Sequence, residues 1–150
     1  MLLVPNELRY SPIQGCGVYA KAPIKKGTLI WKVDPTFDKI IDTNQAFPTE
    51  VTRFLLVYGV AYRHADDEDF IYVDTDNARF MNHGDPCNVL PGEVIGEGIA
   101  VRDIAAGEEL TVDYRTFGAS VDWEVLHGFP IEGYPTFKAL LQALKKKLRA

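Results

Sequence analysis

Residues 79–88 read Arg79-Phe80-Met81-Asn82-His83-Gly84-Asp85-Pro86-Cys87-Asn88, a polar segment that contains two large apolar residues near its start. Asparagine amides satisfy backbone groups in irregular loops, and they also bind the polar edges of ligands. The segment alone therefore fits either a structural loop or a binding loop. His83, Asp85 and Cys87 alternate along an extended chain as metal ligands can, but the sequence offers no second pair of ligands at the usual spacing, so we expect no metal site.

Two further segments lie on either side of this one. Downstream, a turn glycine leads into an apparent strand that ends in an Asp-Tyr pair, Gly107-Glu108-Glu109-Leu110-Thr111-Val112-Asp113-Tyr114. Upstream, the glycines of Gly15-Cys16-Gly17 allow a tight turn and a close approach of the backbone to a ligand. Each is unspecific alone, and no base partner is evident for Cys16 as a nucleophile.

The order and spacing of the three segments together resemble the SET domain family, protein-lysine methyltransferases that use S-adenosylmethionine. That family carries a GxG segment, an R-F-x-N-H motif with a second asparagine six residues after the first, and G-E-E-L-T-x-D-Y. The resemblance covers about residues 10–114. The matching residues are Gly15 and Gly17, then Arg79, Phe80, Asn82, His83 and Asn88, then Gly107, Glu108, Glu109, Leu110, Thr111, Asp113 and Tyr114.

The sequence predicts a mainly β protein with few helices. Short apolar runs between turn residues predict strands at 17–20, 28–33, 70–73, 98–101 and 109–112. One helix is predicted to start at Pro48-Thr49, with Val51, Phe54, Leu55 and Tyr58 on one side. A second, over 135–148, carries apolar residues at spacings of three and four and ends in lysines, which suits the helix dipole.

The family resemblance implies an architecture that the strand pattern alone does not reach. It implies small curved β-sheets of the β-clip type around a knot-like crossing, in which the segment ending at Tyr114 passes beneath the loop of Asn82 and His83. We accordingly expect a SET domain core over 1–114. A C-terminal helical extension over 115–150 is expected to close the substrate channel.

The resemblance also implies roles for individual residues. Tyr114 is expected to be the catalytic tyrosine, and the cofactor site is expected to comprise Gly15, Cys16, Gly17, Arg79, Asn82, His83 and Tyr114. Val112 stands where some members carry an aromatic residue that limits the number of methyl groups added. Several aromatic residues are candidates for the lysine channel, although core packing is favoured for each of them taken singly. They are Tyr58, Tyr62, Tyr72, Trp123, Phe129 and Tyr134.

The sequence departs from the family pattern at three places. Cys16 replaces an aromatic residue that is common between the glycines, Gly84 replaces a usual serine, and Pro86 stands one position early. Eukaryotic members often add a cysteine-rich zinc segment after the domain, whereas no cysteine follows Cys87 here. The chain is therefore similar to the compact stand-alone members of viral and bacterial type.

Composition narrows the range of partners. The chain has 150 residues, 47% of them apolar, which suits one domain. Its net charge of −5 disfavours direct nucleic-acid binding and suits a lysine-rich partner. No apolar run approaches the roughly 20 residues of a membrane span, so no membrane association is expected. The start of the chain does not resemble a signal peptide, which favours the cytoplasm, with the nucleus or a host-cell nucleus as alternatives.

The expected function is methyl transfer from S-adenosylmethionine to the ε-amine of lysine in a protein, with a histone, a histone-like protein or another basic protein as acceptor. No metal cofactor is expected, and both a monomer and a homodimer are compatible with the sequence. The alternative is a catalytically weak SET domain that serves as a peptide-binding interaction module. Cys16 favours that alternative, whereas the Asn82-His83 pair and Tyr114 oppose it.

Overall fold

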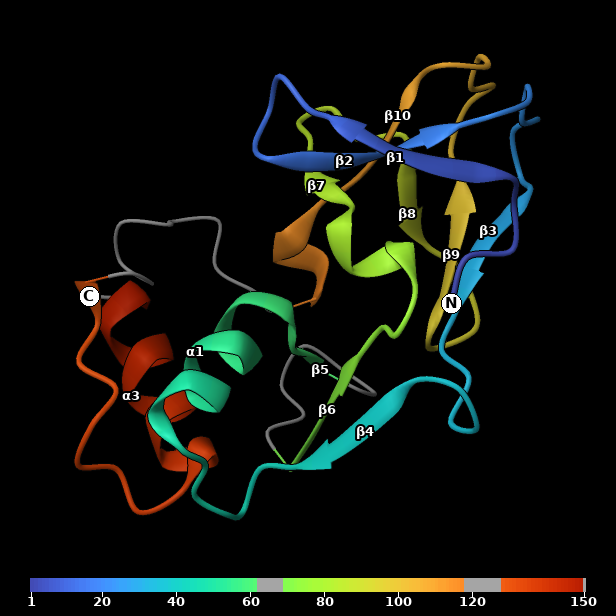
Figure 1. The fold of residues 1–150 in the computed structure, drawn as a ribbon. Helices are drawn as coiled ribbons and strands as arrows, with labels where there is room; N and C mark the ends of the chain where they lie inside the picture. Colours follow the sequence, from blue (N-terminus) through green and yellow to red (C-terminus); the bar gives the residue numbers. More distant parts are fainter. Residues whose placement is uncertain (62–68, 118–127, 150) are drawn as a thin grey trace.

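The computed structural model describes residues 1–61, 69–117 and 128–149, and within them the protein is mainly β with two α-helices. In Figure 1 the larger sheet lies at one end of the molecule, and the helices α1 (Thr49–Tyr58) and α3 (Phe137–Arg149) lie together at the other. A three-stranded sheet stands between them, in the order β4 (Lys39–Asp42), β6 (Phe70–Val73) and β5 (Val60–Ala61). In the described part of the chain, no helix is long and apolar enough to cross a bilayer.

The larger sheet has seven strands in the order β1-β2-β10-β8-β9-β3, and β7 adds to β10. All pairs are antiparallel except those of β10 with β7 and β8, which are parallel. Two 3-10 turns, η1 (Asn77–Phe80) and η2 (Tyr114–Phe117), flank the motif strands. The strands are β1 (Asn6–Tyr10), β2 (Cys16–Ala20), β3 (Leu29–Lys32), β7 (Asn82–His83), β8 (Val89–Pro91), β9 (Glu97–Ala100) and β10 (Glu109–Val112).

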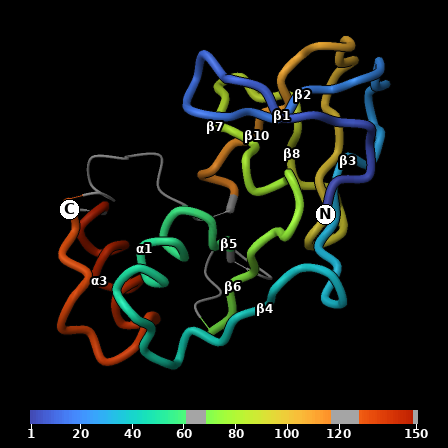
Figure 2. Tube along the Cα trace, in the orientation of Figure 1, coloured from blue at the N-terminus to red at the C-terminus, as the bar shows by residue number. Residues whose placement is uncertain are grey.

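The N-terminal segment joins the two edges of this sheet. Leu2 forms a β-bridge with Trp31 of β3, and the Leu3 amide donates to the Ile30 carbonyl at 2.8 Å. A few residues later the same segment becomes β1, which pairs with β2 at the opposite edge. Figure 2 shows this course, in which the chain leaves the N-terminus beside β3 and then crosses to β1. Residues 1–10 are therefore a seam that closes the sheet on itself.

Two apolar clusters form the core. The first fills the larger sheet and includes Val18, Ile30, Val89 and Leu110, each fully buried. The second lies between the helices and the smaller sheet, and consists of Leu55, Ile71, Val73, Phe129, Phe137, Leu140 and Leu144. The sequence pattern explains α3, because its buried residues recur every three or four positions on one face.

The strands predicted from the apolar runs correspond to β2, β3, β6, β9 and β10, and both predicted helices are present. The predicted apolar side of α1 does not form one buried face. Leu55 and Thr52 are buried, but Val51 and Phe54 are 41% and 44% exposed. Leu55 packs in the second cluster with α3 and the smaller sheet, whereas Phe54, Val57 and Tyr58 line a pocket.

Candidate functional site

The two ends of the loop between β7 and β8 are both hydrogen-bonded to β10. The Gly84 amide donates to the Val112 carbonyl at 3.0 Å, and the Thr111 amide donates to Asn88 Oδ1 at 2.8 Å. Asn88 Nδ2 in turn donates to the Glu109 carbonyl at 2.7 Å. Asn88 is only 2% exposed, so these bonds satisfy backbone groups that water does not reach. The second asparagine of the motif thus holds the crossing together.

The close fit at this crossing explains the glycine at position 84. A Cβ atom added there would lie 2.7 Å from Thr111 Oγ1 and 2.8 Å from Thr111 Cβ, closer than real Cβ contacts come. Thr111 therefore fills the space that a serine side chain at position 84 would need. The glycine at position 84 lets the loop lie directly against Thr111, and both asparagines keep their hydrogen bonds.

Asn82 ties this loop to the glycine turn that precedes β2. Its Nδ2 lies 3.1 Å from the Gln14 carbonyl, 3.0 Å from the Cys16 carbonyl and 2.8 Å from Glu109 Oε1. At 7% exposure, the amide is nearly enclosed by these acceptors. Asn82 therefore fixes the backbone of the turn whose outer face is exposed at Gly15 and Cys16.

Glu109 is a further member of the site that the sequence analysis did not single out. Its Oε2 accepts from Ser11 Oγ at 2.9 Å and from the Tyr19 hydroxyl at 3.1 Å, while Oε1 accepts from Asn82. The carboxylate lies directly against Gly17, where a Cβ would come within 2.6 Å of Glu109 Cδ. One carboxylate thus connects all three motif segments. The motif match over residues 107–114 already included Glu109, but it implied no role for this side chain.

Tyr114 follows β10 and is held from two sides. Its hydroxyl donates to the Met81 carbonyl at 2.8 Å, and its backbone amide donates to His83 Nδ1 at 3.3 Å. The His83 and Tyr114 rings lie 5.6 Å apart. Burial, with smaller contributions from Tyr58 and Glu109, raises the pKa of Tyr114 to about 12. The hydroxyl therefore stays protonated near neutral pH and is oriented rather than basic.

A pocket of about 610 Å³ opens beside these groups. Its walls come from the turn before β2, from α1 and from η1, and the Tyr58 and Phe80 rings meet edge-on with centroids 6.0 Å apart. Arg79 lies over the Phe80 ring at 4.7 Å. Small-molecule sites usually measure roughly 300–1,000 Å³. The lining residues are Gln14, Gly15, Cys16, Glu50, Arg53, Phe54, Val57, Tyr58, Arg79, Phe80, Asn82 and Tyr114.

The pocket brings together some of the residues expected from the sequence and leaves others elsewhere. Those that line it are Gly15, Cys16, Tyr58, Arg79, Asn82 and Tyr114. Gly17 and His83 lie behind this lining, against Glu109 and Tyr114 respectively. Of the α1 residues in the lining, only Tyr58 was a candidate from the sequence, because a helix surface that faces a pocket has the same apolar spacing as one that faces a core. The α1 residues not expected at the site are Glu50, Arg53, Phe54 and Val57.

Three candidates for the lysine channel lie in the core. Val112 is 4% exposed within the first cluster, and Tyr72, 3% exposed, packs beside Trp31 with ring centroids 6.2 Å apart. Phe129 is 7% exposed in the second cluster, where its ring stacks on Tyr134 at 6.2 Å. These side chains do not reach the pocket because neighbouring apolar residues enclose them. Tyr62 and Trp123 lie outside the described residues.

No three His, Cys, Asp or Glu side chains converge as a metal-ligand set among residues 1–61, 69–117 and 128–149. His83, the histidine of the motif, instead contacts Asp113 with Nδ1 and Oδ1 3.6 Å apart. Both of these His83 contacts, with Asp113 and with the Tyr114 amide, are made to the segment that carries Tyr114. This arrangement makes His83 a positioning residue for that tyrosine.

Comparison with known proteins gives a family and a fold. The profile of one family, described as the SET domain, matches residues 15–115. No curated protein sequence matches the chain. Many solved structures share the fold, and one of them is a Plasmodium falciparum protein described as a candidate histone methyltransferase. It is 18% identical with a TM-score of 0.54, over 82% of this chain and 99% of that one.

Two further similar structures come from fungi. A Chaetomium thermophilum Polycomb Repressive Complex 2 bound to the inhibitor GSK126 is 22% identical with a TM-score of 0.57, over 76% of this chain but 15% of that one. The Neurospora SET domain protein DIM-5, a histone lysine methyltransferase, is 22% identical with a TM-score of 0.50, over 75% of this chain and 53% of that one. At these identities the likeness shows the fold alone.

Proposed function

The chain belongs to the SET domain family, and from that membership we propose that it transfers a methyl group from S-adenosylmethionine to the ε-amine of a lysine in a protein. The observation that carries the proposal is the convergence of the three motif segments on one pocket. Gly15 and Cys16, Asn82, and Tyr114 come from distant parts of the chain and line the same cavity. A purely structural role for the motifs would not require them to share an open surface.

The lining suits the proposed cofactor. Tyr58 and Phe80 provide aromatic faces for an adenine ring, and Arg79 provides a guanidinium for a carboxylate. Glu50 supplies a negative charge for an ammonium group, and the exposed backbone at Gly15 and Cys16 supplies polar groups. One of the similar solved structures, also of Polycomb Repressive Complex 2, is bound to S-adenosylmethionine, which adds support.

The chain's own residues supply alignment rather than a strong base. When bound, S-adenosylmethionine provides an electrophilic methyl group on a cationic sulfur. A free lysine amine has a pKa of about 10.4, and enclosure beside a cation lowers it, which favours the nucleophilic neutral form. The Tyr114 hydroxyl donates its proton to Met81, so its oxygen remains available to accept a hydrogen bond from the amine. In this proposal Tyr114 fixes the direction of the attacking lone pair.

Calorimetric titration of S-adenosylmethionine tests the proposal. We expect saturable binding by the unaltered protein, and an affinity at least about tenfold weaker in Asn82→Ala, because the turn at Gly15 and Cys16 loses its anchor. Asn44→Ala is the matched control, since the exposed Asn44 donates to Asp42 Oδ1 at 3.1 Å outside the pocket. Absence of binding by a folded sample, or equal affinity in Asn82→Ala and the control, would contradict the proposal.

We propose a basic protein as the acceptor, with histones and histone-like proteins as the first candidates. Two observations support this class: the net charge of −5, and the description of similar structures as histone methyltransferases. Incubation with labelled cofactor and a panel of histones, ribosomal proteins and acidic control proteins would test it. Preferential labelling of the acidic controls would reject a basic acceptor.

We further propose that residues 115–150 support the channel as a C-terminal extension. The described part of this segment packs against α1 through Phe129, Phe137 and Leu140, and α1 lines the pocket. The backbone amides that open α3 donate to the Gln45 and Thr43 carbonyls at 2.8 and 2.9 Å. The extension would therefore act from behind α1, as a prop for the pocket wall.

A second candidate function is a peptide-binding module without efficient transfer. Cys16 favours it, because this exposed residue lines the pocket where the family often has an aromatic ring. Cys16→Tyr separates the two candidates. A weakly binding enzyme should gain cofactor affinity and turnover, whereas a module should bind basic peptides equally well before and after the change.

A further inference from the structure

Strand β1 lies at an edge of the larger sheet once the chain has left β3. Leu2 and Leu3 contact β3, whereas from Asn6 onward β2 is the only strand partner in the described part of the chain. Leu8 and Tyr10 in β1 are 40% and 83% exposed. An edge strand presents unpaired N–H and C=O groups, which are a template for pairing with a further strand. β1 therefore has the features of an interaction surface.

The hydrogen bonds between β1 and β2 show which backbone groups face outward. The Lys21 amide donates to the Pro5 carbonyl at 3.0 Å. At the other end of the strand, the Ser11 amide donates to the Gly15 carbonyl at 2.9 Å. Alternate residues of an antiparallel strand bond to the same neighbour, so the odd-numbered residues of β1 bond to β2. The even-numbered residues direct their backbone groups toward the open edge, and these are Asn6, Leu8 and Tyr10.

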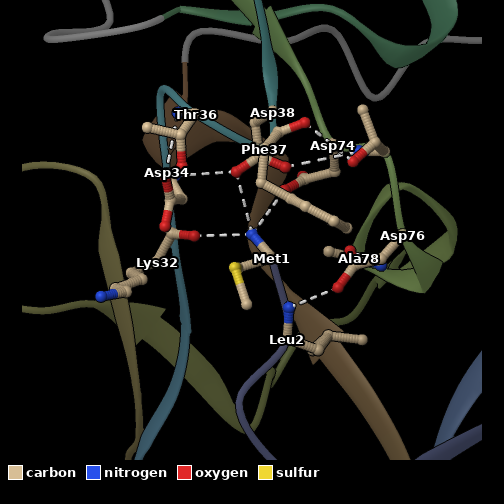
Figure 3. Close-up of polar contacts among 11 residues, drawn as sticks. Met1, Leu2, Lys32, Asp34, Thr36, Phe37, Asp38, Asp74, Asp76 and Ala78 are labelled. Atoms are coloured by element: carbon tan, nitrogen blue, oxygen red, sulfur yellow. Dashed lines mark hydrogen bonds and ion pairs between the residues drawn. The ribbon is translucent and has the colours of Figure 1, made fainter.

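The strand is also held by η1 and by the segment that precedes it. Asn77 Nδ2 donates to Asn6 Oδ1 at 2.9 Å. Figure 3 shows the Leu2 amide donating to Asp76 Oδ2 at 2.7 Å, beside the Met1 nitrogen and its two carboxylate partners. Because these contacts and the ladder with β2 fix β1, a partner strand meets an edge that is already formed, and ordering it costs little free energy.

The side chains of β1 carry a charge pattern that complements itself. Glu7 and Arg9 lie two residues apart on one face of the strand and form an exposed ion pair with each other. When two copies of β1 pair in antiparallel fashion with Leu8 opposite Leu8, Glu7 of each copy faces Arg9 of the other. A shift of two residues either way places Glu7 opposite Glu7 or Arg9 opposite Arg9, and like charges directly opposite are destabilising. The sequence of β1 thus favours one register.

We propose that β1 is the contact surface for a second copy of this chain, so that the two larger sheets join across a two-fold axis at Leu8. The two Leu8 residues exchange both backbone hydrogen bonds, and Asn6 of each copy does the same with Tyr10 of the other. The Tyr10 carbonyl already accepts from the Tyr19 hydroxyl at 3.2 Å, and its second lone pair serves the new bond.

The self-complementary pattern is the reason for choosing a second copy over an unrelated peptide. A matching strand must present a positive residue opposite Glu7 and a negative residue opposite Arg9, and β1 itself meets both requirements. A contact that uses the same patch on both copies closes on itself, so association stops at the dimer. One strand from each copy is a small contact, and we expect a dissociation constant of about 10–100 μM.

Sedimentation velocity of the full chain between about 5 and 500 μM measures the association. We expect the unaltered chain to change from monomer to dimer over this range. Arg9→Glu places carboxylates opposite one another and should weaken the dimer at least about tenfold, and Glu7→Arg should do the same through opposed guanidinium groups. A chain that stays monomeric throughout, or a dimer that neither variant weakens, would overturn the proposal.

Mixing the two variants gives the sharpest test. In a mixed dimer every charge of the Arg9→Glu chain faces an opposite charge of the Glu7→Arg chain, so the equimolar mixture should associate about as tightly as the unaltered chain. Lys146→Glu is the matched control, because it reverses an exposed charge on α3 at the opposite end of the molecule and should leave the dimer unchanged (Figure 1). A mixture that stays monomeric, or a control as weak as Arg9→Glu, would reject this surface. No cofactor is present, so the result is independent of the proposed methyl transfer.

Discussion

The two halves of the molecule each have an apolar core, but they differ in the hydrogen bonds that join their segments. In the half that carries the motifs, Asn82, Asn88 and Glu109 join separate segments through directional hydrogen bonds of 2.7–3.1 Å. In the half that carries the helices, the contacts are mainly apolar, among Leu55, Phe137, Leu140 and their neighbours. A hydrogen bond fixes distance and direction, whereas apolar burial stabilises contact without specifying a single geometry. The comparison indicates that substitutions of these polar residues act mainly on the site, whereas substitutions of buried apolar residues act mainly on stability.

The largest expected effect tests the apolar half. Leu140 is 1% exposed in the second cluster, so Leu140→Ala should lower the free energy of unfolding by about 3 kcal/mol. Urea unfolding measures this, with Leu148→Ala as control because Leu148 on the same helix is 41% exposed. Because Leu140 packs in the cluster behind α1, folded Leu140→Ala should also bind S-adenosylmethionine about threefold more weakly. An unchanged affinity would contradict the proposal that the extension supports the pocket wall through α1.

The next effect tests the motif half. Tyr114→Phe removes the hydroxyl bonded to Met81, and we expect turnover to fall by about 100-fold with cofactor affinity nearly unchanged, because orientation matters most in the transition state. Methyl transfer and calorimetric binding are measured on the same samples. Tyr10→Phe, at a site 83% exposed, is the control. Equal losses of turnover and affinity would assign Tyr114 to binding instead.

A smaller effect is expected for the carboxylate that links the motifs. Glu109→Gln keeps the size of the side chain but places an NH₂ group where Asn82 or the Ser11 and Tyr19 hydroxyls donate. We expect cofactor affinity to fall about tenfold, because the turn at Gly15 loses one of its supports. Glu93→Gln removes the same charge from an exposed loop and should bind normally. Normal binding by Glu109→Gln would confine the carboxylate to a structural role.

The smallest effect concerns pH. Because the folded-state pKa of Tyr114 is raised to about 12 from an ordinary 10, its contribution to stability is complete below about 10 and is lost as the pH rises through about 12. Between pH 7 and 10 the methyl-transfer rate should therefore follow ionisation of the acceptor amine alone. Ultraviolet titration of the unaltered protein against Tyr114→Phe detects the phenolate directly. A phenolate of Tyr114 formed below pH 9 would contradict the assignment.

Local sequence pattern was sufficient to predict many of the strands and helices. The strands β2, β6 and β10 contain short apolar runs, and α3 repeats apolar residues at spacings of three and four, so these patterns are visible without any partner. The strands β5, β7 and β8 were not predicted because two or three residues carry too little pattern, and β4 was missed because only Ile40 and Ile41 in it are apolar. β1 was also missed, since its exposed Leu8 and Tyr10 depart from a pattern of buried alternation.

The candidate site was also predicted only in part, because local sequence identifies motif residues but not their packing. Motif residues such as Asn82 and Tyr114 were identifiable from their order and spacing, and they meet at the pocket. The aromatic residues were not distinguishable from one another, and Tyr72 and Phe129 proved to be core residues while Tyr58 lines the pocket. Burial depends on which side of an element faces its neighbours, and that is a property of packing rather than of local sequence.

The sequence by itself determined the family, the mainly β class and the motif residues, because these depend on residue types at fixed spacing along the chain. Only the tertiary structure decided that Glu109 joins the three motifs, that Thr111 fills the space beside Gly84, and that Asp38 and Asp74 meet at the Met1 nitrogen. These contacts link residues that are distant in sequence. Their energies depend on distances and burial that arise only when the segments pack together.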